Sequence, residues 1–134
     1  RELWVVLPLV EGGLLDCFQS VARGAAPTPL RIGKGAAVTT VLAARGYPDS
    51  PEKGAAITIP PSLPEGATVL HAGTMRDDEG ILRASGGRVL NVTAVAPTFP
   101  EAQRRSREVA DAIHFEGKLF RRDIGWREAA RRGV

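Results

Sequence analysis

Five short segments rich in β-branched residues, separated by Gly, Pro and Asp, constrain the fold more than any other feature of this chain. Between residues 36 and 96 they read AAVTTVLAA, AAITI, TVLHAGT, GILRAS and RVLNVTAVA. Segments of this kind with turn residues between them are typical of strands in a sheet or a small barrel. Gly86 and Gly87 lie between the last two segments, which predicts a hairpin turn with positive φ at both central positions. We therefore expect about five mainly antiparallel strands.

Apolar residues change to helical spacing directly after the last of these segments. A helix over residues 99–114 would bury one face of small and apolar side chains: Ala102, Ser106, Val109, Ala110 and Ile113. Thr98 is followed three residues later by Glu101, which is the pattern of a capping box. We expect this helix to pack across a curved sheet in an α+β fold. A short strand near 118–121, a turn and a brief C-terminal helix should follow.

A second helix is predicted before the strands. Leucine, phenylalanine and valine recur at helical spacing over residues 13–23, and Gly24 lies where such a helix would end. Residues 26–35 are rich in Pro, Gly and Ala with little periodicity, as in a linker. We therefore divide the chain into residues 1–25, this linker, and a β-rich domain over 36–134.

Composition and charge narrow the class of protein. The chain of 134 residues is 43% hydrophobic and 25% charged, which is typical of a globular protein, and no apolar run reaches the roughly 20 residues that cross a bilayer. The opening run begins with Arg rather than Met and has no turn signal ahead of it, so we expect N-terminal context to be missing. Cys17 is the single cysteine, which excludes an intramolecular disulfide and fits a reducing compartment. We expect a soluble, cytoplasmic protein with no membrane partner.

The net charge of +3 raises the question of nucleic-acid binding. Nine of the eighteen basic residues lie between Arg104 and Arg132, but five acidic residues lie among them. Stacking aromatic residues are not interleaved with these arginines, although single-strand binders need them. The pattern favours solvated helix faces over a nucleic-acid surface.

The common catalytic signatures are absent, and three loops remain as candidates. No P-loop, serine elbow or zinc pattern occurs, and the NVT sequon at Asn91 lies within a predicted strand. The loop RGYPDSPEKG combines stiffening prolines with Lys53, a point charge suited to a phosphate or carboxylate. His71 and Thr74 end a strand in HAGT, and Arg122 lies in FRRDIG. The alternatives are a rigid solvated loop, a structural histidine and a surface ion pair, respectively.

The segments VLAARGYPDSPEKG, VLHAGT, SGGRVLNVTAVAPTFPEAQ and IHFEGKLFRRDIG occur in this order. Together they resemble the C-terminal domain of the phosphoribosylamine–glycine ligases, also called glycinamide ribonucleotide synthetases. The resemblance runs from about Ala36 to Arg127. The upstream stretch ELWVVLPLVEGGLLDCFQSVARG resembles the last helix of that family's ATP-grasp region. The resemblance implies a small hybrid-barrel-like C-terminal domain preceded by the end of an ATP-grasp domain.

The resemblance also implies a function in de novo purine biosynthesis. Ligases of this family use ATP, with Mg²⁺ or Mn²⁺, to join glycine to 5-phosphoribosylamine, giving glycinamide ribonucleotide, ADP and phosphate. Glu2 matches the final residue of the family signature Arg-Phe-Gly-Asp-Pro-Glu and would be a metal ligand, although Leu3 and Trp4 replace the usual small polar residues. Five residues are expected to face the active site: Tyr47, Lys53, His71, Thr74 and Arg122. Because the N-terminal domain and most of the ATP-grasp domain are missing, we expect the chain alone to be inactive.

Two other readings remain open at this point. The chain could be the last domain of another ATP-grasp carboxylate–amine ligase or of a biotin-carboxylase-like enzyme, although GYPDSPEKG together with RRDIG argues against this. A free-standing basic module that binds an anionic ligand or nucleic acid is the other possibility. Salt-sensitive binding to a random oligonucleotide would favour that module.

Overall fold

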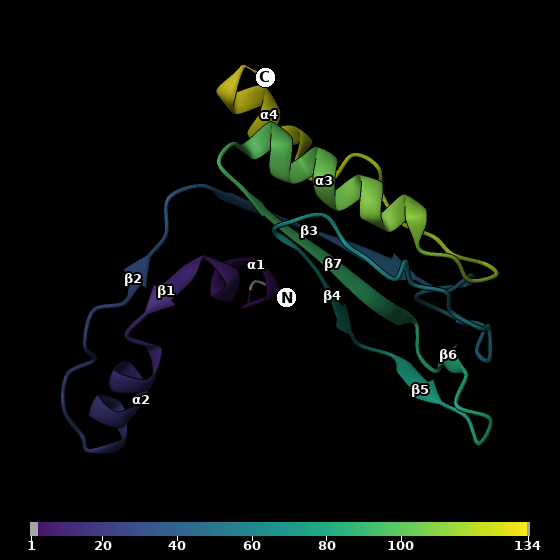
Figure 1. The fold of residues 1–134 in the computed structure, drawn as a ribbon, viewed down its shortest axis with the longest axis horizontal. Coiled ribbons are helices and arrows are strands. Elements are labelled where there is room, and N and C mark those ends of the chain that lie inside the picture. Colours follow the sequence, from purple (N-terminus) through teal and green to yellow (C-terminus); the bar gives the residue numbers. More distant parts are fainter. Residues whose placement is uncertain (1–2, 134) are drawn as a thin grey trace.

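A three-stranded antiparallel sheet forms the centre of the computed structural model, which describes residues 3–133 (Figure 1). The strands lie in the order β3 (Ala36–Ala43), β7 (Arg88–Ala96) and β4 (Ala67–His71). Strand β3 pairs along the whole length of β7, and β4 pairs with the other edge of β7. The predicted α+β class and the antiparallel pairing are therefore confirmed.

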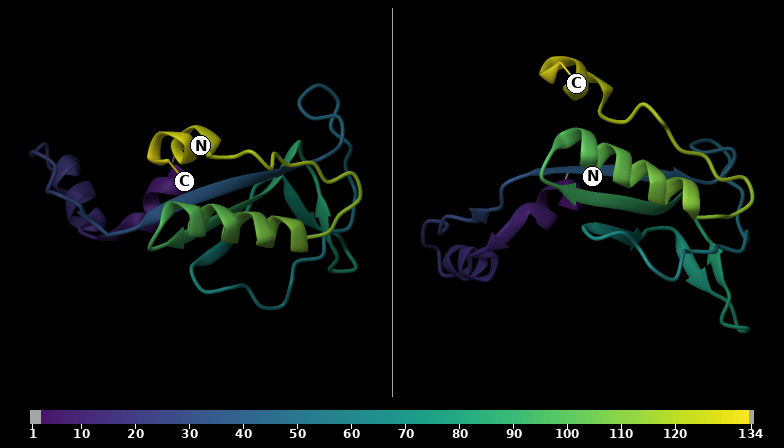
Figure 2. Two further views of the ribbon diagram at one scale, coloured as in Figure 1. Left: turned by 90° about the horizontal axis from the view of Figure 1, so that it is seen from above. Right: turned by 45° about the horizontal axis from the view of Figure 1, so that its top comes forward.

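Helix α3 (Phe99–Ala112) covers one face of this sheet, as Figures 1 and 2 show. The face predicted from helical spacing is the one that is buried: Ala102, Ser106, Val109 and Ala110 in the helix, with Ile113 directly after it. Along β3 the buried and half-buried residues alternate, because successive side chains of a strand point to opposite faces. Thr40 and Leu42 are thus buried against α3.

A buried hydroxyl pair ties α3 to the two longest strands. The Ser106 hydroxyl donates to the Val92 carbonyl at 2.9 Å, and 2.8 Å separates its oxygen from the hydroxyl oxygen of Thr40. All three groups are therefore satisfied without water, as buried polar groups require. The small residue at position 106 lets the helix approach the sheet closely enough for this contact.

The capping box predicted at the start of α3 is wrong. Thr98 takes the extended N-cap conformation, but its side chain makes no capping hydrogen bond. Glu101 instead forms an ion pair with Arg105, with 2.7 Å between Oε1 and the guanidinium nitrogen. Arg105, one turn further along the helix, therefore binds the carboxylate that a capping box would use.

The hairpin predicted at Gly86 and Gly87 is also wrong. The hairpin lies one segment earlier, between β5 (Thr74–Arg76) and β6 (Leu82–Ala84). Its turn is organised by Asp77, whose Oδ1 accepts hydrogen bonds from the backbone N–H groups of Glu79 at 3.1 Å and Ile81 at 2.8 Å. A side chain that accepts backbone N–H groups in this way favours a turn at its own position, so the chain reverses here rather than at Gly86 and Gly87.

Gly86 and Gly87 lie where other segments approach the backbone closely, and this close approach, rather than a positive φ, explains why glycine is present. Neither Gly86 nor Gly87 is among the glycines with positive φ. A Cβ added at Gly87 would lie 2.6 Å from Cδ2 of Tyr47, and one added at Gly73 would lie 2.8 Å from Cα of Gly86. These glycines let the loop 45–54 and the end of β4 pack against the same short stretch of backbone.

Other strand predictions need correction. AAITI forms no regular strand, but it is joined to its neighbours by the isolated bridges Ala56↔Arg83 and Thr58↔His114. TVLHAGT is divided between β4 and β5. The strand expected near 118–121 is reduced to one bridge between Ala43 and Leu119, and it is followed by the short helix α4 (Trp126–Arg132). Regular pairing is therefore limited to the three-stranded sheet and two separate two-stranded ladders.

The first part of the chain forms an arm that extends away from the sheet (Figures 1 and 2). We call residues 3–35 the N-terminal arm and residues 36–133 the body. The arm contains α1 (Leu3–Val6), the 3₁₀ turn η1 (Leu7–Leu9), β1 (Val10–Gly12), α2 (Leu14–Ala22) and β2 (Arg31–Ile32). The predicted helix is confirmed as α2, while β2 pairs antiparallel with β1 inside the stretch expected to be a linker. The boundaries at 1–25, 26–35 and 36–134 stay a prediction.

The arm has no buried residue, whereas the buried apolar residues of the body form two core clusters. Large apolar side chains of the arm are exposed, among them Leu15 at 67% and Phe18 at 61%. No helix within residues 3–133 combines the length and the hydropathy that crossing a bilayer would need.

Candidate functional site

The sheet face opposite α3, which we call the open face, is hollowed beside α1, although Thr93 and Asn91 on it are buried. Because paired residues of neighbouring strands share a face, Thr39 and Val41 of β3 lie on this open face with Thr93 and Asn91 of β7. Helix α1 packs against the middle of β3 and β7 on this face. The Thr93 hydroxyl donates to the backbone carbonyl of Trp4 at 3.0 Å, and the Thr39 hydroxyl oxygen lies 2.7 Å from that of Thr93 and 3.3 Å from the same carbonyl. The arm therefore forms one wall of this face.

A β-bulge brings Arg88 onto the open face. Strict alternation along β7 would place Arg88 on the same side as Leu90, which is buried under α3. The pairing register shifts here, however: Leu90 pairs with Leu42, and Arg88 pairs with the next residue, Ala43. The bulge leaves Val89 as the extra residue and turns Arg88 to the open face, as bulges commonly re-aim a side chain.

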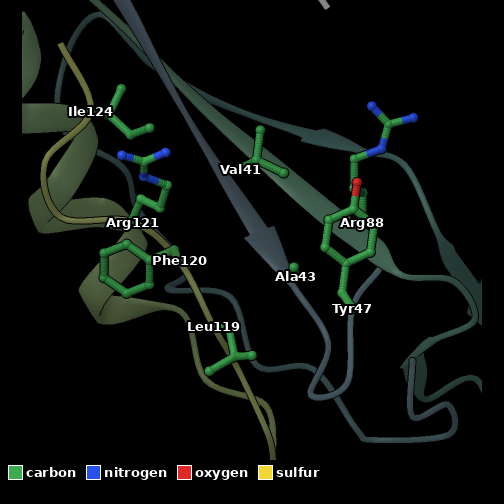
Figure 3. Close-up of a pocket in the computed structure, with 8 residues that line it drawn as sticks. All are labelled: Val41, Ala43, Tyr47, Arg88, Leu119, Phe120, Arg121 and Ile124. Atoms are coloured by element: carbon green, nitrogen blue, oxygen red, sulfur yellow. The ribbon is translucent and has the colours of Figure 1, made fainter. Parts of the chain in front are cut away.

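Three hollows meet at Arg88. The first lies beside α1 and is lined by Trp4, Val5, Thr39, Val41, Ala72, Arg88 and Asn91, with a volume of about 340 Å³. A second, of about 500 Å³, lies between the loop 45–54 and the end of β4, where Tyr47, Gly73 and Gly87 line it with Arg88. The third, of about 420 Å³, lies between β3 and the segment 119–124 (Figure 3). Arg88 lines all three hollows and Tyr47 lines two of them.

The predicted site residues are not gathered in one place. Tyr47 lines the hollow shown in Figure 3 together with Arg88, on the side away from Phe120 and Arg121. His71 and Thr74 are joined to each other by a hydrogen bond, with 2.9 Å between Nδ1 and Oγ1, and they do not line the three hollows at Arg88. Lys53 is exposed on its loop and makes no ion pair within residues 3–133. Their roles at an active site stay a prediction.

Arg122 is held in a surface ion pair at the end of α3. Its guanidinium donates to both carboxylate oxygens of Asp111, at 2.9 and 2.5 Å, and lies 5.0 Å from the ring centre of Phe120. The hydrogen bond with Arg122 lowers the pKa of Asp111, and the same bond raises the pKa of Arg122. The contacts in the chain are those of the alternative raised from the sequence, a surface ion pair.

The predicted metal ligand cannot be placed, because Glu2 lies outside the described residues. Across residues 3–133, no group of three or more His, Cys, Asp and Glu side chains is arranged to hold a metal ion.

Sequence reasoning missed the two residues that the open face brings together, Arg88 and Asn91. Asn91 is only 5% exposed, so a glycan could not be attached to it in the folded chain. Within residues 3–133 its side-chain amide makes no hydrogen bond, although it lines the hollow beside α1. A buried amide in the middle of an apolar strand was the available signal. No signal in the sequence marked the orientation of Arg88, since the bulge that turns it depends on the pairing with β3.

The comparisons with known proteins agree on one family. The family described as phosphoribosylglycinamide synthetase, C domain, matches residues 37–127. The phosphoribosylamine–glycine ligase of Chlorobaculum tepidum is 47% identical over 127 residues, which cover 92% of this chain and 30% of that protein. The trifunctional purine biosynthetic protein adenosine-3 of Bos taurus is 40% identical over 132 residues, covering 96% of this chain and 13% of that protein.

A solved structure has the same fold. The crystal structure of phosphoribosylamine–glycine ligase from Thermotoga maritima superposes with a TM-score of 0.77 at 43% identity, covering 90% of this chain and 29% of that one. The chain thus spans about 30% of the length of the single-activity relatives that it matches.

Proposed function

This chain belongs to the phosphoribosylglycinamide synthetase C-domain family, and on that premise we propose that it is the C-terminal part of a phosphoribosylamine–glycine ligase. The activity proposed for the complete protein is the ATP-dependent joining of glycine to 5-phosphoribosylamine in purine biosynthesis. The observation that carries the proposal is the 47% identity over 92% of the chain to a relative with this name. The match includes the open face, since β3 and β7 lie within residues 37–127 apart from Ala36.

The exposed arm supports the view that this chain is one part of a larger folded unit. Side chains as apolar as Leu15, Phe18 and Val21 lie on one face of α2 without being covered. An apolar stripe of this kind normally packs against another element. We propose that residues 3–25 complete an ATP-grasp domain, and that the body closes one side of the active site.

ATP and Mg²⁺ or Mn²⁺ belong to this proposal as ligands of the complete protein. The described residues do not fit a metal site of their own, since no suitable group of ligands occurs within 3–133. We therefore place nucleotide and metal outside the body, with Glu2 as the one ligand that this chain would contribute. The body's part is to position substrate groups and exclude water, which needs no metal ligand in residues 36–133.

A chimera tests the proposed function. The region of the Thermotoga maritima ligase that matches this chain would be replaced by residues 1–134, and phosphate release would be measured with ATP, glycine and 5-phosphoribosylamine. We expect turnover that requires all three substrates. The purified 134-residue chain should show none, because most of the ligase is absent.

Two controls accompany this experiment: a deletion chimera and the 134-residue chain alone. A chimera lacking residues 36–134 should be inactive, which separates a contribution of the body from the activity of the remaining enzyme. A folded chimera without turnover would contradict the proposal. So would a chain that turns over these substrates alone. Salt-sensitive binding of the chain to a random oligonucleotide would instead favour a basic binding module.

A further inference from the structure

We propose that the hollow beside α1 is an oxyanion site, in which Arg88 and Asn91 bind a carboxylate or phosphate of a small ligand. The two residues come from one strand, β7, and line a hollow of about 340 Å³ on the open face. This volume is at the lower end of the range for small-molecule pockets and suits a ligand of a few heavy atoms.

Asn91 is the first observation that points to a ligand. Its side chain is buried among the strands of the sheet, with 5% of the residue exposed, yet its amide has no hydrogen-bond partner within residues 3–133. Its polar atoms lie at the wall of the hollow. The amide is not among the buried polar atoms without a partner, so it is accessible from the hollow and can bond water or a ligand there. The neighbouring buried hydroxyls are satisfied, since Thr93 bonds both Thr39 and the Trp4 carbonyl.

Arg88 supplies the charge. It is the one ionisable residue among those lining this hollow, and no carboxylate lines the hollow with it. Its side chain makes no ion pair or hydrogen bond within the described part of the chain, in contrast to Arg83, Arg105 and Arg122, each held by a carboxylate. A guanidinium presents a planar fork of donors that matches a carboxylate or phosphate in two parallel hydrogen bonds.

The remaining walls suit a small ligand that has its polar group at one end. Val41 and Ala72 are apolar, and α1 closes the side of the hollow with Trp4 and Val5. The bulge at Val89 is what places the charge and the amide on the same face.

The proposed function narrows the source of the anion. Both named substrates of the relatives carry one, glycine as a carboxylate and phosphoribosylamine as a phosphate. This assignment to a substrate rests on the proposed function, but oxyanion binding at Arg88 and Asn91 does not. Binding to the chain and turnover by the chimera can therefore fail separately.

Nuclear magnetic resonance on the 134-residue chain tests the site directly. Inorganic phosphate, ribose 5-phosphate and glycine would each be titrated while the Arg88 Nε–H and Asn91 side-chain amide signals are followed. We expect saturable shifts of both signals with at least one of the three probes. Stronger binding of the two phosphates identifies a phosphate site, and stronger binding of glycine identifies a carboxylate site.

Variants separate the site from general charge. Arg88→Met should weaken binding at least about tenfold, and Arg88→Lys by a smaller factor because a point charge replaces the fork. Asn91→Asp should abolish binding, since it places a carboxylate of similar shape beside Arg88. Arg104→Met is the matched control: Arg104 is an exposed arginine on α3, and its replacement should leave binding unchanged.

Three results would overturn the inference. Unshifted Arg88 and Asn91 signals with all three probes would do so, as would wild-type affinity in Arg88→Met. Equal losses in Arg88→Met and Arg104→Met would show attraction to net charge only. Arg88 is exposed, so its variants should fold, and they decide the question even if Asn91→Asp does not. A chimera without turnover, combined with retained anion binding, would sink the proposed function and leave the site standing.

Discussion

The body and the N-terminal arm use similar apolar residues with opposite results. Leu42 of β3 is fully buried between the sheet and α3, whereas Leu15 of α2 is 67% exposed. In the body, strand pairing and helix packing cover each other's apolar faces, and buried hydroxyls find partners there. In the arm, helix and ladder form without a covering layer. Local sequence pattern therefore suffices to form an amphipathic helix here, but burial requires a partner surface.

The largest expected effect comes from a matched pair of leucine truncations. Leu42→Ala should destabilise the chain by about 3 kcal/mol, because it leaves a cavity in a closed core. Leu15→Ala should change the free energy of unfolding by less than about 0.5 kcal/mol, as for an ordinary surface position. Urea denaturation of both variants measures this. Similar losses at the two positions would break the distinction between body and arm.

Buried hydroxyls provide the second comparison. Ser106→Ala should cost about 1–2 kcal/mol, since it leaves Thr40 without its partner in the body. In the arm, the hydroxyl oxygen of Thr28 is buried and has no partner. Thr28→Val should therefore be neutral or slightly stabilising, because it removes an unsatisfied group of the same shape. Denaturation midpoints in the opposite order would contradict this account of the two regions.

Lysines sharpen the comparison within the body. The Lys118 ammonium donates to the carbonyls of Ala110 at 2.8 Å, Asp111 at 3.0 Å and Ile113, at the end of α3. Lys118→Met keeps the stem but removes these bonds, and should cost about 1 kcal/mol. Lys53→Met, on the exposed loop, is the matched control and should cost nothing measurable in thermal melting. A loss at Lys53 as large as at Lys118 would mean that the loop is held by contacts absent from the structure.

The smallest effect is a pH dependence at the outer edge of the body. Hydrogen bonds from Arg131 and Arg132 lower the pKa of Glu128 to about 2 from its usual 4.5. Because the folded-state pKa is depressed, the stabilisation is present above pH 4.5 and is lost as the pH falls towards 2. The ion pair lies at the surface with two exposed arginines, so we expect a decrease of only about 1–2 °C in Tm over this window. Glu128→Gln should remove that part of the pH dependence, and an unchanged profile in the variant would refute the assignment.

The elements predicted correctly are those with strong local patterns. The spacing of apolar residues in α3 and the β-branched run of β7 carry their own signal, so these elements and the buried face of α3 follow from the sequence. The hairpin was misplaced because the side chain of Asp77 organises a turn that competes with Gly86 and Gly87. Which of two plausible turns forms depends on the partners available to each strand.

The candidate site was less predictable than the fold. Arg88 reaches the open face through a bulge that is set by the register with β3, and no local pattern marks that register. Asn91 looked like a mid-strand residue in a discounted sequon, and its place at the wall of the hollow becomes visible only once the strands and α1 are assembled. Among the predicted site residues that the structure describes, Tyr47 alone lines the hollows at Arg88.

Amide hydrogen exchange tests the central claim, that the arm is completed by the rest of a ligase while the body forms its own core. The 134-residue chain would be compared with the same residues in the Thermotoga maritima chimera. We predict slow exchange for β7 and α3 in both proteins, because their amides lie in the closed core. Amides of α2 should exchange rapidly in the isolated chain and slowly in the chimera. Equal protection of α2 in both proteins, or rapid exchange in both, would contradict the account.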